Sequence, residues 1–380
     1  MERVYMDHAA TSPMNTEVIE EMSSVMKETY GNPSSIHSFG RSARHLVDQA
    51  RTKIAHSLKA DYNDIIFTSG GTEADNLAII GTAHANKSKG KHIITTQIEH
   101  HAVLHACKHL EEQGFEVTYL PVDKSGRVSV QEVEQALRSD TILVTIMYGN
   151  NEVGTIQPIQ EIGQALRDHS AYFHTDAVQA FGSMEIDVSQ LGIDMLSVSG
   201  HKINGPKGIG FLYCHKNVNL LPGSFGGEQE RKRRAGTENV PAIAGLGKAV
   251  EVVQSSLKDK HDLYEGFKSL FRNALMEKNV EFDENGSLEH GLPHVLNLSF
   301  PGTDVESMLM NLDMAGIAVS SGSACTAGSI EPSHVLVAMF GTDSERTKNS
   351  IRFSFGLGNT EAQIVQAADE VAKVVKRLVS

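Results

Sequence analysis

The segment that decides the fold is Ile65-Ile66-Phe67-Thr68-Ser69-Gly70-Gly71-Thr72-Glu73. Its first four residues favour a strand, its glycines favour a turn, and a helical stretch continues from Thr72 to about His84. Short β-rich runs and helical stretches keep alternating between residues 60 and 215. This alternation predicts an α/β fold in which mostly parallel strands carry helices on both faces.

The other strands expected in this sheet are short runs rich in β-branched and aromatic residues. They are residues 92–96, 115–120, 141–148, 171–175, 194–198 and 209–213. A helix is expected near His101 to Gln113. Ligands of such sheets bind beyond the carboxyl ends of the strands, so we expect functional residues directly after strands.

The last third of the chain has a different pattern. A glycine-rich, basic loop at 223–236 is followed by one long helix from Ala242 to about Lys278. Strands at 294–300 and 350–355 and helices at 305–315 and 360–378 then predict a smaller α/β domain. We expect residues 15–255 to form a large domain, and residues 1–14 and 256–380 a small one.

Composition excludes several classes of protein. With 40% hydrophobic and 21% charged residues among 380, the chain is an ordinary globular one. A net charge of −13 argues against direct nucleic-acid or membrane binding, although the basic run at 231–234 is either a local patch or a solvated turn. The sequence has no run of about 18 apolar residues and no signal-peptide pattern, so we expect a cytoplasmic protein.

Lys202 lies in Ser199-Gly200-His201-Lys202-Ile203-Asn204-Gly205-Pro206-Lys207-Gly208, directly after an expected strand. A lysine at a strand end, between small residues and a Gly-Pro turn, suits a Schiff base with a carbonyl compound. The alternative is a solvated loop lysine. The glycine turn before Thr72 suits a phosphate at a helix N-terminus, and its alternative is Thr72 as a plain helix cap.

Two more polar residues follow expected strands. Asp176 could pair with a protonated pyridine nitrogen, or it could cap a helix. His100 could stack on a planar cofactor and move a proton. His101, His105 and His109 share one helical face and could bind a metal, but without a matching second cluster we favour a solvated polar face.

Three cysteines, Cys107, Cys214 and Cys325, offer neither a disulfide framework nor zinc spacing. Cys325 lies in a run of small polar residues, which predicts a mobile, exposed loop at about 320–333 and a thiol suited to nucleophilic attack. The other two fit buried positions. Arg352, inside an apolar strand, needs an anion, either a substrate carboxylate or an internal salt bridge.

Together these motifs resemble the cysteine desulfurases of the NifS/IscS type, in the class-V aminotransferase family. The resemblance runs from Tyr5-Met6-Asp7-His8-Ala9-Ala10-Thr11 through Gly31-Asn32-Pro33-Ser34-Ser35 to the C-terminal strand and helix. It implies a fold-type-I, pyridoxal-phosphate (PLP) enzyme with the aspartate-aminotransferase fold. Its large domain would hold a mostly parallel seven-stranded sheet flanked by helices, beside a smaller C-terminal α/β domain.

The resemblance also implies roles for individual residues. Lys202 would hold the cofactor covalently and act as the base at the substrate Cα, His100 would assist proton transfer, and Cys325 would be the nucleophile. Asn151 and Arg352 would contact the substrate carboxylate. The cofactor contacts would be Gly71, Thr72, His100, Asp176, Gln179, Ser199, His201, Lys202 and, from the other subunit of a homodimer, Thr237.

The implied reaction converts L-cysteine to L-alanine and leaves a persulfide on Cys325. An acceptor protein for iron–sulfur cluster assembly or tRNA thiolation would then take the sulfur. No resident metal is expected, only transient contact of Cys325 with a partner's iron–sulfur cluster. The alternatives are a selenocysteine lyase, another aminotransferase of this fold, or a non-catalytic PLP-binding scaffold. Ala74 and Ala235 depart from the family pattern without replacing a catalytic group.

Overall fold

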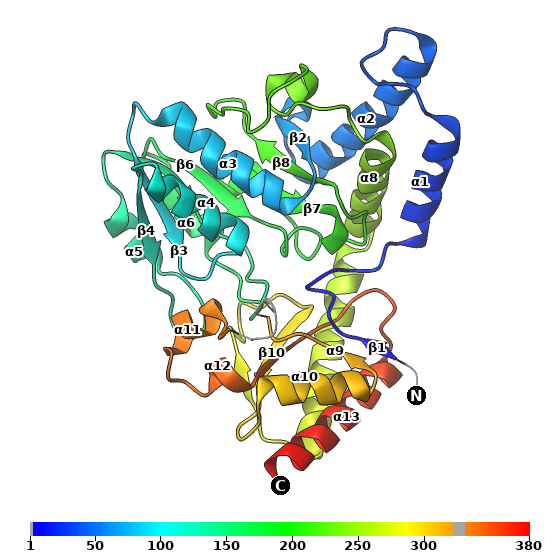
Figure 1. Cartoon of the computed structure of the whole chain (residues 1–380), viewed down its shortest axis with the longest axis vertical. Coiled ribbons are helices and arrows are strands. Elements are labelled where there is room, and N and C mark those ends of the chain that lie inside the picture. The colour runs from blue at the N-terminus through cyan, green and yellow to red at the C-terminus, as the bar shows by residue number, and fades with distance from the viewer. Residues whose placement is uncertain (1–2, 323–330) are drawn as a thin grey trace.

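The computed structural model describes residues 3–322 and 331–380 (Figure 1). Cys325, and with it the prediction of a mobile loop around this cysteine, lies outside the described residues. Figure 1 shows two bodies, one around a large sheet and one around the C-terminal elements, joined by a pair of consecutive helices.

The main sheet has seven strands in the order β2-β8-β7-β6-β5-β3-β4. Only β8 runs antiparallel, to both of its neighbours, so the prediction of a mostly parallel seven-stranded sheet is confirmed. The strands are β2 (Ile65–Thr68), β3 (His92–Thr96), β4 (Glu116–Leu120), β5 (Thr141–Thr145), β6 (Tyr172–Asp176), β7 (Met195–Ser199) and β8 (Gly210–Cys214).

Helices cover both faces of this sheet (Figure 1). Alternate strand residues enter different cores: Ile65 and Phe67 pack into one, and Ile66 packs into the other. Helices α3 (Gly71–Asn86) and α4 (His101–Glu112) cover the second face. The first face carries α1 (Thr16–Glu28), α2 (Ser38–Ser57), α5 (Val130–Ala136), α6 (Ile159–Ala165), α7 (Val188–Leu191) and α8 (Val240–Ser255).

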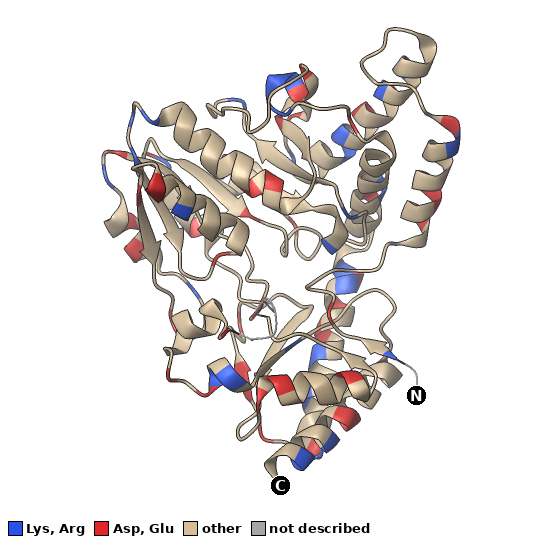
Figure 2. Ribbon diagram, viewed as in Figure 1, with Lys and Arg blue, Asp and Glu red and all other residues tan. Residues whose placement is uncertain are grey.

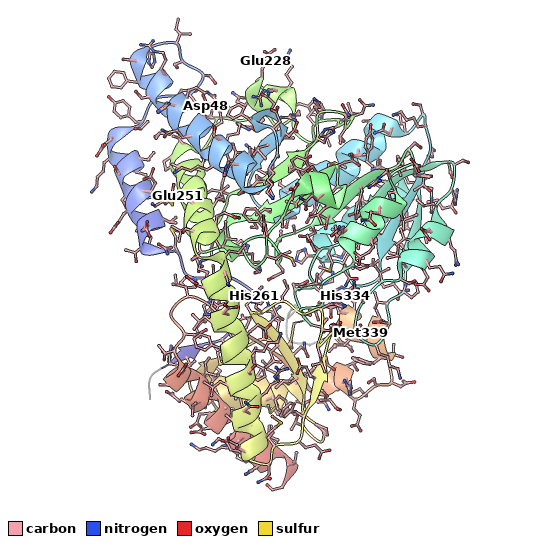
Figure 3. All side chains as sticks on the ribbon, turned by 180° about the vertical axis from the view of Figure 1, so that it is seen from behind. Asp48, Glu228, Glu251, His261, His334 and Met339 are labelled. Carbon is pink, nitrogen blue, oxygen red and sulfur yellow. The ribbon has the colours of Figure 1, made fainter. Side chains whose placement is uncertain are left out.

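The prediction of one continuous helix from Ala242 to about Lys278 is wrong. The structure has α8 and then α9 (Leu257–Glu277), with a break at Ser256. The hydroxyls of Ser255 and Ser256 both donate to the carbonyl of Val252, at 3.0 and 2.8 Å, and such bonds compete with the helical ladder. The two helices still connect the bodies, as the labelled Glu251 and His261 mark in Figure 3.

The second body has its own hydrophobic core, separate from the two cores of the main sheet. The N-terminal strand belongs to it, since β1 pairs in parallel with β11, and the antiparallel sheet has the order β12-β10-β9. Its elements are β1 (Val4–Tyr5), β9 (Asp283–Asn285), β10 (Val295–Ser299), α10 (Val305–Met314), β11 (Ile317–Ala318), α11 (His334–Phe340), α12 (Arg346–Asn349), β12 (Ser350–Ser354) and α13 (Glu361–Val379).

Short 3₁₀ helices complete the described chain: η1 (Tyr62–Asp64), η2 (Gly200–Lys202) and η3 (Gln229–Lys232). The last of these lies in the segment 223–236, which we expected to be entirely loop. Acidic and basic residues are spread over both bodies (Figure 2). Within the described ranges, no helix combines the length and apolar character needed to cross a membrane.

Candidate active site

A cavity of about 650 Å³ lies at the carboxyl ends of the main-sheet strands, and residues of the second body also line it. Of the twelve predicted site residues, ten line this one cavity: Gly71, Thr72, His100, Asn151, Asp176, Gln179, Ser199, His201, Lys202 and Arg352. Thr237 is exposed and is absent from the lining. Cys325 lies outside the described part of the chain.

Lys202 ends the short helix η2 that follows β7, and its side chain reaches the N-terminal segment. Its Nζ donates to the carbonyls of Ala9 and, at 2.8 Å, Ala10. Burial, together with the positive charge of Arg352, lowers the pKa of Lys202 to about 8. An amine with this pKa is partly neutral at physiological pH, which suits reaction with a carbonyl and proton exchange.

The connection from β2 to α3 exposes a helix N-terminus to the cavity. Gly70 is the N-cap, and its φ of 150° is one that L side chains rarely adopt. A Cβ on Gly71 would lie 2.8 Å from Cγ2 of Val178, so a side chain there would clash. Thr72 lies inside the first turn of the helix, and the alternative of Thr72 as the cap is wrong. The arrangement fits a bound phosphate.

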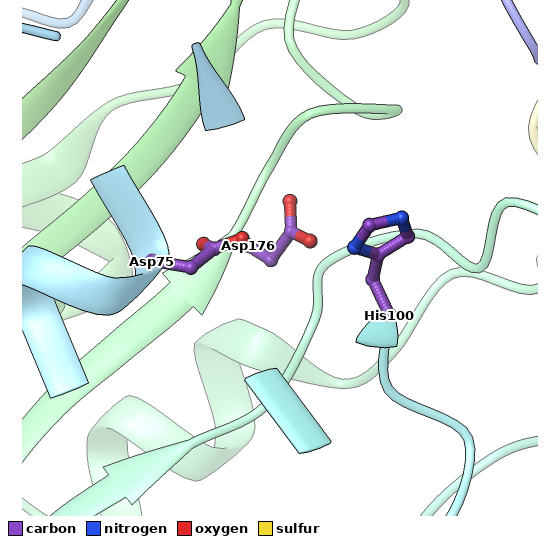
Figure 4. A group of neighbouring side chains, drawn as sticks. All are labelled: Asp75, His100 and Asp176. Atoms are coloured by element: carbon purple, nitrogen blue, oxygen red, sulfur yellow. The ribbon is translucent and has the colours of Figure 1, made fainter. Parts of the chain in front are cut away.

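Asp176 is the last residue of β6 and is buried. Its Oδ1 accepts from the backbone N–H of Val178 at 2.9 Å in a turn, so the alternative of a helix cap is wrong. Burial raises the pKa of Asp176, while the nearby His100 and Lys202 oppose this rise. In Figure 4, Asp176 lies between Asp75 and His100.

His100 is the N-cap of α4, where Nδ1 accepts from the N–H of Ala102 at 3.1 Å. In the neutral ring the proton is therefore on Nε2. Desolvation in the cavity lowers the pKa of His100, which favours this neutral form.

Within the part of the chain that the structure describes, the histidines on the face of α4 do not form a group of three with ligand atoms close enough to share a metal ion. His101 stacks on His105 with ring centroids 5.2 Å apart, and His109 bonds Gln113 instead. Among the described residues, the group of three whose ligand atoms lie within 4.8 Å of one another comprises Asp75, His100 and Asp176.

Arg352 lies on β12 and reaches the cavity from the second body. Its Nη2 donates to Asp7 Oδ1 and its Nη1 to the carbonyl of Asn151, both at 2.9 Å. The internal salt bridge considered as the alternative is thus present. Nε is nevertheless buried without a hydrogen-bond partner among the described atoms, so the guanidinium has an unused donor.

Gln179 and His201 contribute neutral polar groups. Gln179 Nε2 donates to the carbonyl of Ala9 at 2.9 Å, and its Oε1 lies 3.2 Å from Nε2 of His294. His201 Nδ1 lies 3.2 Å from Oγ1 of Thr11. Burial lowers the pKa of His201 to about 4, so this ring is uncharged at neutral pH.

Comparison with known proteins places the chain in a family. The model of the family described as Aminotransferase class-V matches residues 4–366. The chain belongs to the class-V aminotransferase family.

Relatives of this class-V aminotransferase include the putative cysteine desulfurase IscS 1 of Bacillus subtilis (strain 168), which is 64% identical over the full length of both chains. Among solved structures, a NifS-like protein superposes with a TM-score of 0.92 at 36% identity, covering 99% of this chain and all of the other. A structure described as SspA in complex with cysteine reaches 0.80 at 39% identity, covering 93% and 98%. The predicted resemblance to cysteine desulfurases is confirmed.

Four carboxylates that lie in or against the cavity were not among the predicted site residues. Glu73, Asp75 and Glu152 line the cavity, and Asp7 pairs with Arg352. Glu152 is buried, accepts from the hydroxyl of Ser333, and has a pKa raised by burial. Asp7 and Glu152 stood inside recognised motifs, and Asp75 lies three residues after Thr72, so helical spacing could have indicated it.

Enzymes of this family use PLP, and the residues of the cavity fit that group. Lys202 is a half-buried amine with a pKa of about 8, and a helix N-terminus without side chains at Gly70 and Gly71 suits the phosphate. Asp176 provides a buried carboxylate for a ring nitrogen, and Arg352 retains a free donor for an anion. These groups all face one cavity.

Proposed function

We propose that this protein is a PLP-dependent cysteine desulfurase that takes sulfur from L-cysteine and releases L-alanine. The observation that carries the proposal is the convergence of Lys202, Asp176 and Arg352 on one cavity, with a lysine pKa near 8. The relatives named cysteine desulfurase, and the similar structure described with bound cysteine, support the choice of substrate.

The cofactor would be held at its two ends. The backbone at Gly71, together with Thr72, Ser199 and His201, would hold the phosphate. Asp176 would pair with the ring nitrogen, Gln179 would bond the phenolic oxygen, and His100 would stack on the ring. When bound, PLP supplies an electron sink for negative charge that develops at the Cα of an amino acid.

The chain's own residues would carry out the binding and proton transfers. Arg352 and Asn151 would orient the carboxylate of L-cysteine. Lys202, as the neutral amine, would remove the Cα proton, and His100 would move a proton through Nε2. The thiolate of Cys325 would then form a bond to the substrate sulfur as the Cβ–S bond breaks. Protonation of the remaining three-carbon fragment gives L-alanine.

The sulfur left on Cys325 would pass to an acceptor protein of iron–sulfur cluster assembly or tRNA thiolation. We also propose a cytoplasmic homodimer in which the exposed Thr237 contacts the phosphate in the other subunit. Residues 15–255 would act as the large domain, and residues 1–14 with 256–380 as the small one.

The direct test is release of L-alanine and sulfide from L-cysteine by the cofactor-loaded protein, with a reductant present. We expect turnover in the wild type and in Cys107→Ala, whose thiol is buried with a pKa raised by that burial. Cys325→Ala should retain the cofactor absorbance and lose sulfide release. Equal sulfide release by Cys325→Ala and the wild type would contradict the proposal and leave a different reaction of the same fold.

A further inference from the structure

Two buried carboxyl groups lie side by side at the floor of the cavity. Asp75, the fifth residue of α3, is 1% exposed, and Asp176, at the end of β6, is 5% exposed. Their nearest oxygens lie within 4.8 Å of each other, and Figure 4 shows the two side chains adjacent. Two negative charges this close, and out of water, repel strongly.

No cationic side chain in the described part of the chain compensates the charge of Asp75. Its Oδ1 has no hydrogen-bond partner among the described residues and lies 3.7 Å from Nε2 of His174. His174 is completely buried, and burial lowers its pKa to about 3, so the ring is neutral. Both of its nitrogens already have hydroxyl partners, Thr145 Oγ1 at 2.8 Å and Ser197 Oγ at 2.9 Å.

The surroundings favour the negative charge on Asp176. Asp176 accepts an N–H from Val178 and feels the positive potential of Lys202. Within residues 3–322 and 331–380, the side-chain hydrogen-bond partner of Asp75 is the hydroxyl of Ser197, and burial with the charge of Asp176 raises the pKa of Asp75 well above the ordinary value. A protonated Asp75 can donate to Ser197 Oγ, which can in turn donate to Nε2 of His174, so the added proton on Asp75 has an acceptor.

The other titratable groups facing the pair do not change this balance. Glu99, after β3, is fully buried, and burial raises its pKa to about 8, so at neutral pH it is mostly the neutral acid; the charge that it gains at higher pH repels both aspartates. His100, before α4, and Lys202, after β7, face Asp176. The positive potential of Lys202 and His100 therefore favours the ionised form of Asp176, whereas no described cation favours the ionised form of Asp75.

We propose that Asp75 and Asp176 hold a single proton at neutral pH, with Asp75 the neutral acid and Asp176 the carboxylate. Asp75 is then a positioning residue: it keeps Asp176 as the single anion available to a ring nitrogen. The consequence for the cofactor rests on the proposed function, whereas the protonation state of the pair does not.

Infrared spectroscopy of the full-length, cofactor-loaded chain tests the protonation state directly. With ¹³C-carboxyl aspartate, we expect an isotope-shifted band of a protonated carboxyl at neutral pH. Asp64→Asn provides the background, since Asp64 is a buried acid whose pKa is raised by burial but which is absent from the cavity lining. The band should persist in Asp64→Asn and disappear in Asp75→Asn.

Cofactor retention gives a second readout. Because asparagine imitates the neutral acid, Asp75→Asn should keep the equilibrium affinity for PLP within about twofold of the wild type. An ionised Asp75 would give the opposite result, because its removal would take a negative charge away from the cofactor ring; a tenfold change or more would overturn the proposal.

Absence of the protonated-carboxyl band in the Asp64→Asn background also overturns it, and this measurement holds even if Asp75→Asn does not fold. Failure of the desulfurase proposal appears separately, as missing alanine release with the band present.

Discussion

Two regions of the molecule contain buried charged groups. The ion pair between Arg51 and Glu230 is compensated, in that its charges and hydrogen-bonding atoms have partners, whereas charged groups of the cavity retain atoms without a partner among the described residues. Arg51 makes two bonds to Glu230, at 2.9 and 2.6 Å, and Glu230 also accepts the N–H of Phe67 at 3.1 Å. In the cavity, Asp75 Oδ1 and Arg352 Nε have no hydrogen-bond partner among the described residues. Full compensation fixes a structure, whereas incomplete compensation leaves groups free for protons and ligands.

The compensated pair also holds a strained segment. Glu230, Arg231 and Lys232 have φ values of 46°, 56° and 67°, in the left-handed region that side chains other than glycine disfavour. The ion pair anchors this segment to α2 and β2. Farther along, Arg234 pairs with Glu73 at 2.8 Å, beside the glycine turn of the cavity.

The largest effect on activity is expected in the cavity, at Lys202. Lys202→Ala removes the proposed base and should lower kcat for alanine formation by at least about 10²-fold, measured by steady-state turnover. Lys216→Ala, at an exposed lysine after β8, is the control. Because Lys202 is a desolvated amine, its loss should leave the melting temperature of the cofactor-free chain unchanged or higher. A large fall would mean that Lys202 is mainly structural.

At the buried ion pair, Glu230→Ala should lower the free energy of unfolding by about 3–5 kcal/mol, because it leaves the guanidinium of Arg51 buried without its carboxylate partner. Chemical denaturation measures this change. The matched control is Glu228→Ala, which breaks an exposed pair with Lys232 in the same segment and should cost at most about 1 kcal/mol. Similar losses in both variants would remove the distinction between the two regions.

The pH dependence of the rate should report Lys202. Its pKa is lowered to about 8, so the neutral amine is lost as pH falls through that value, and kcat should decrease about tenfold from pH 8 to about pH 6.7. A rate profile over this window checks it. An acidic limb near the ordinary lysine pKa would show that burial does not tune this amine.

A smaller effect is expected at Glu99, a buried acid with no cationic partner among the residues that the structure describes. Its pKa is raised from 4.5 to about 8, so the folded chain loses stability relative to a neutral side chain as pH rises between these values. Glu99→Gln should therefore melt a few degrees higher than the wild type at pH 8, with little difference near pH 4. Glu112→Gln, at an exposed position of α4, should show no such trend.

Local sequence patterns predicted the sheet and the central residues of the cavity because these residues lie at or shortly after the ends of strands. The carboxyl ends of parallel strands meet at one edge, so Lys202, Asp176 and His100 had to converge. Asp75 escaped notice because its role depends on which residues pack below the strand ends. The break at Ser256 was also missed, because serine hydroxyls compete with a helix only in a suitable side-chain rotamer.

The most direct test of the central claim is a single turnover without reductant. Cofactor-loaded protein is mixed with L-cysteine, and alanine and the mass of the peptide containing Cys325 are measured together. The account predicts one alanine per active site and one extra sulfur atom on Cys325. Alanine formed in that amount, with Cys325 unmodified, would contradict a desulfurase that carries sulfur on this residue.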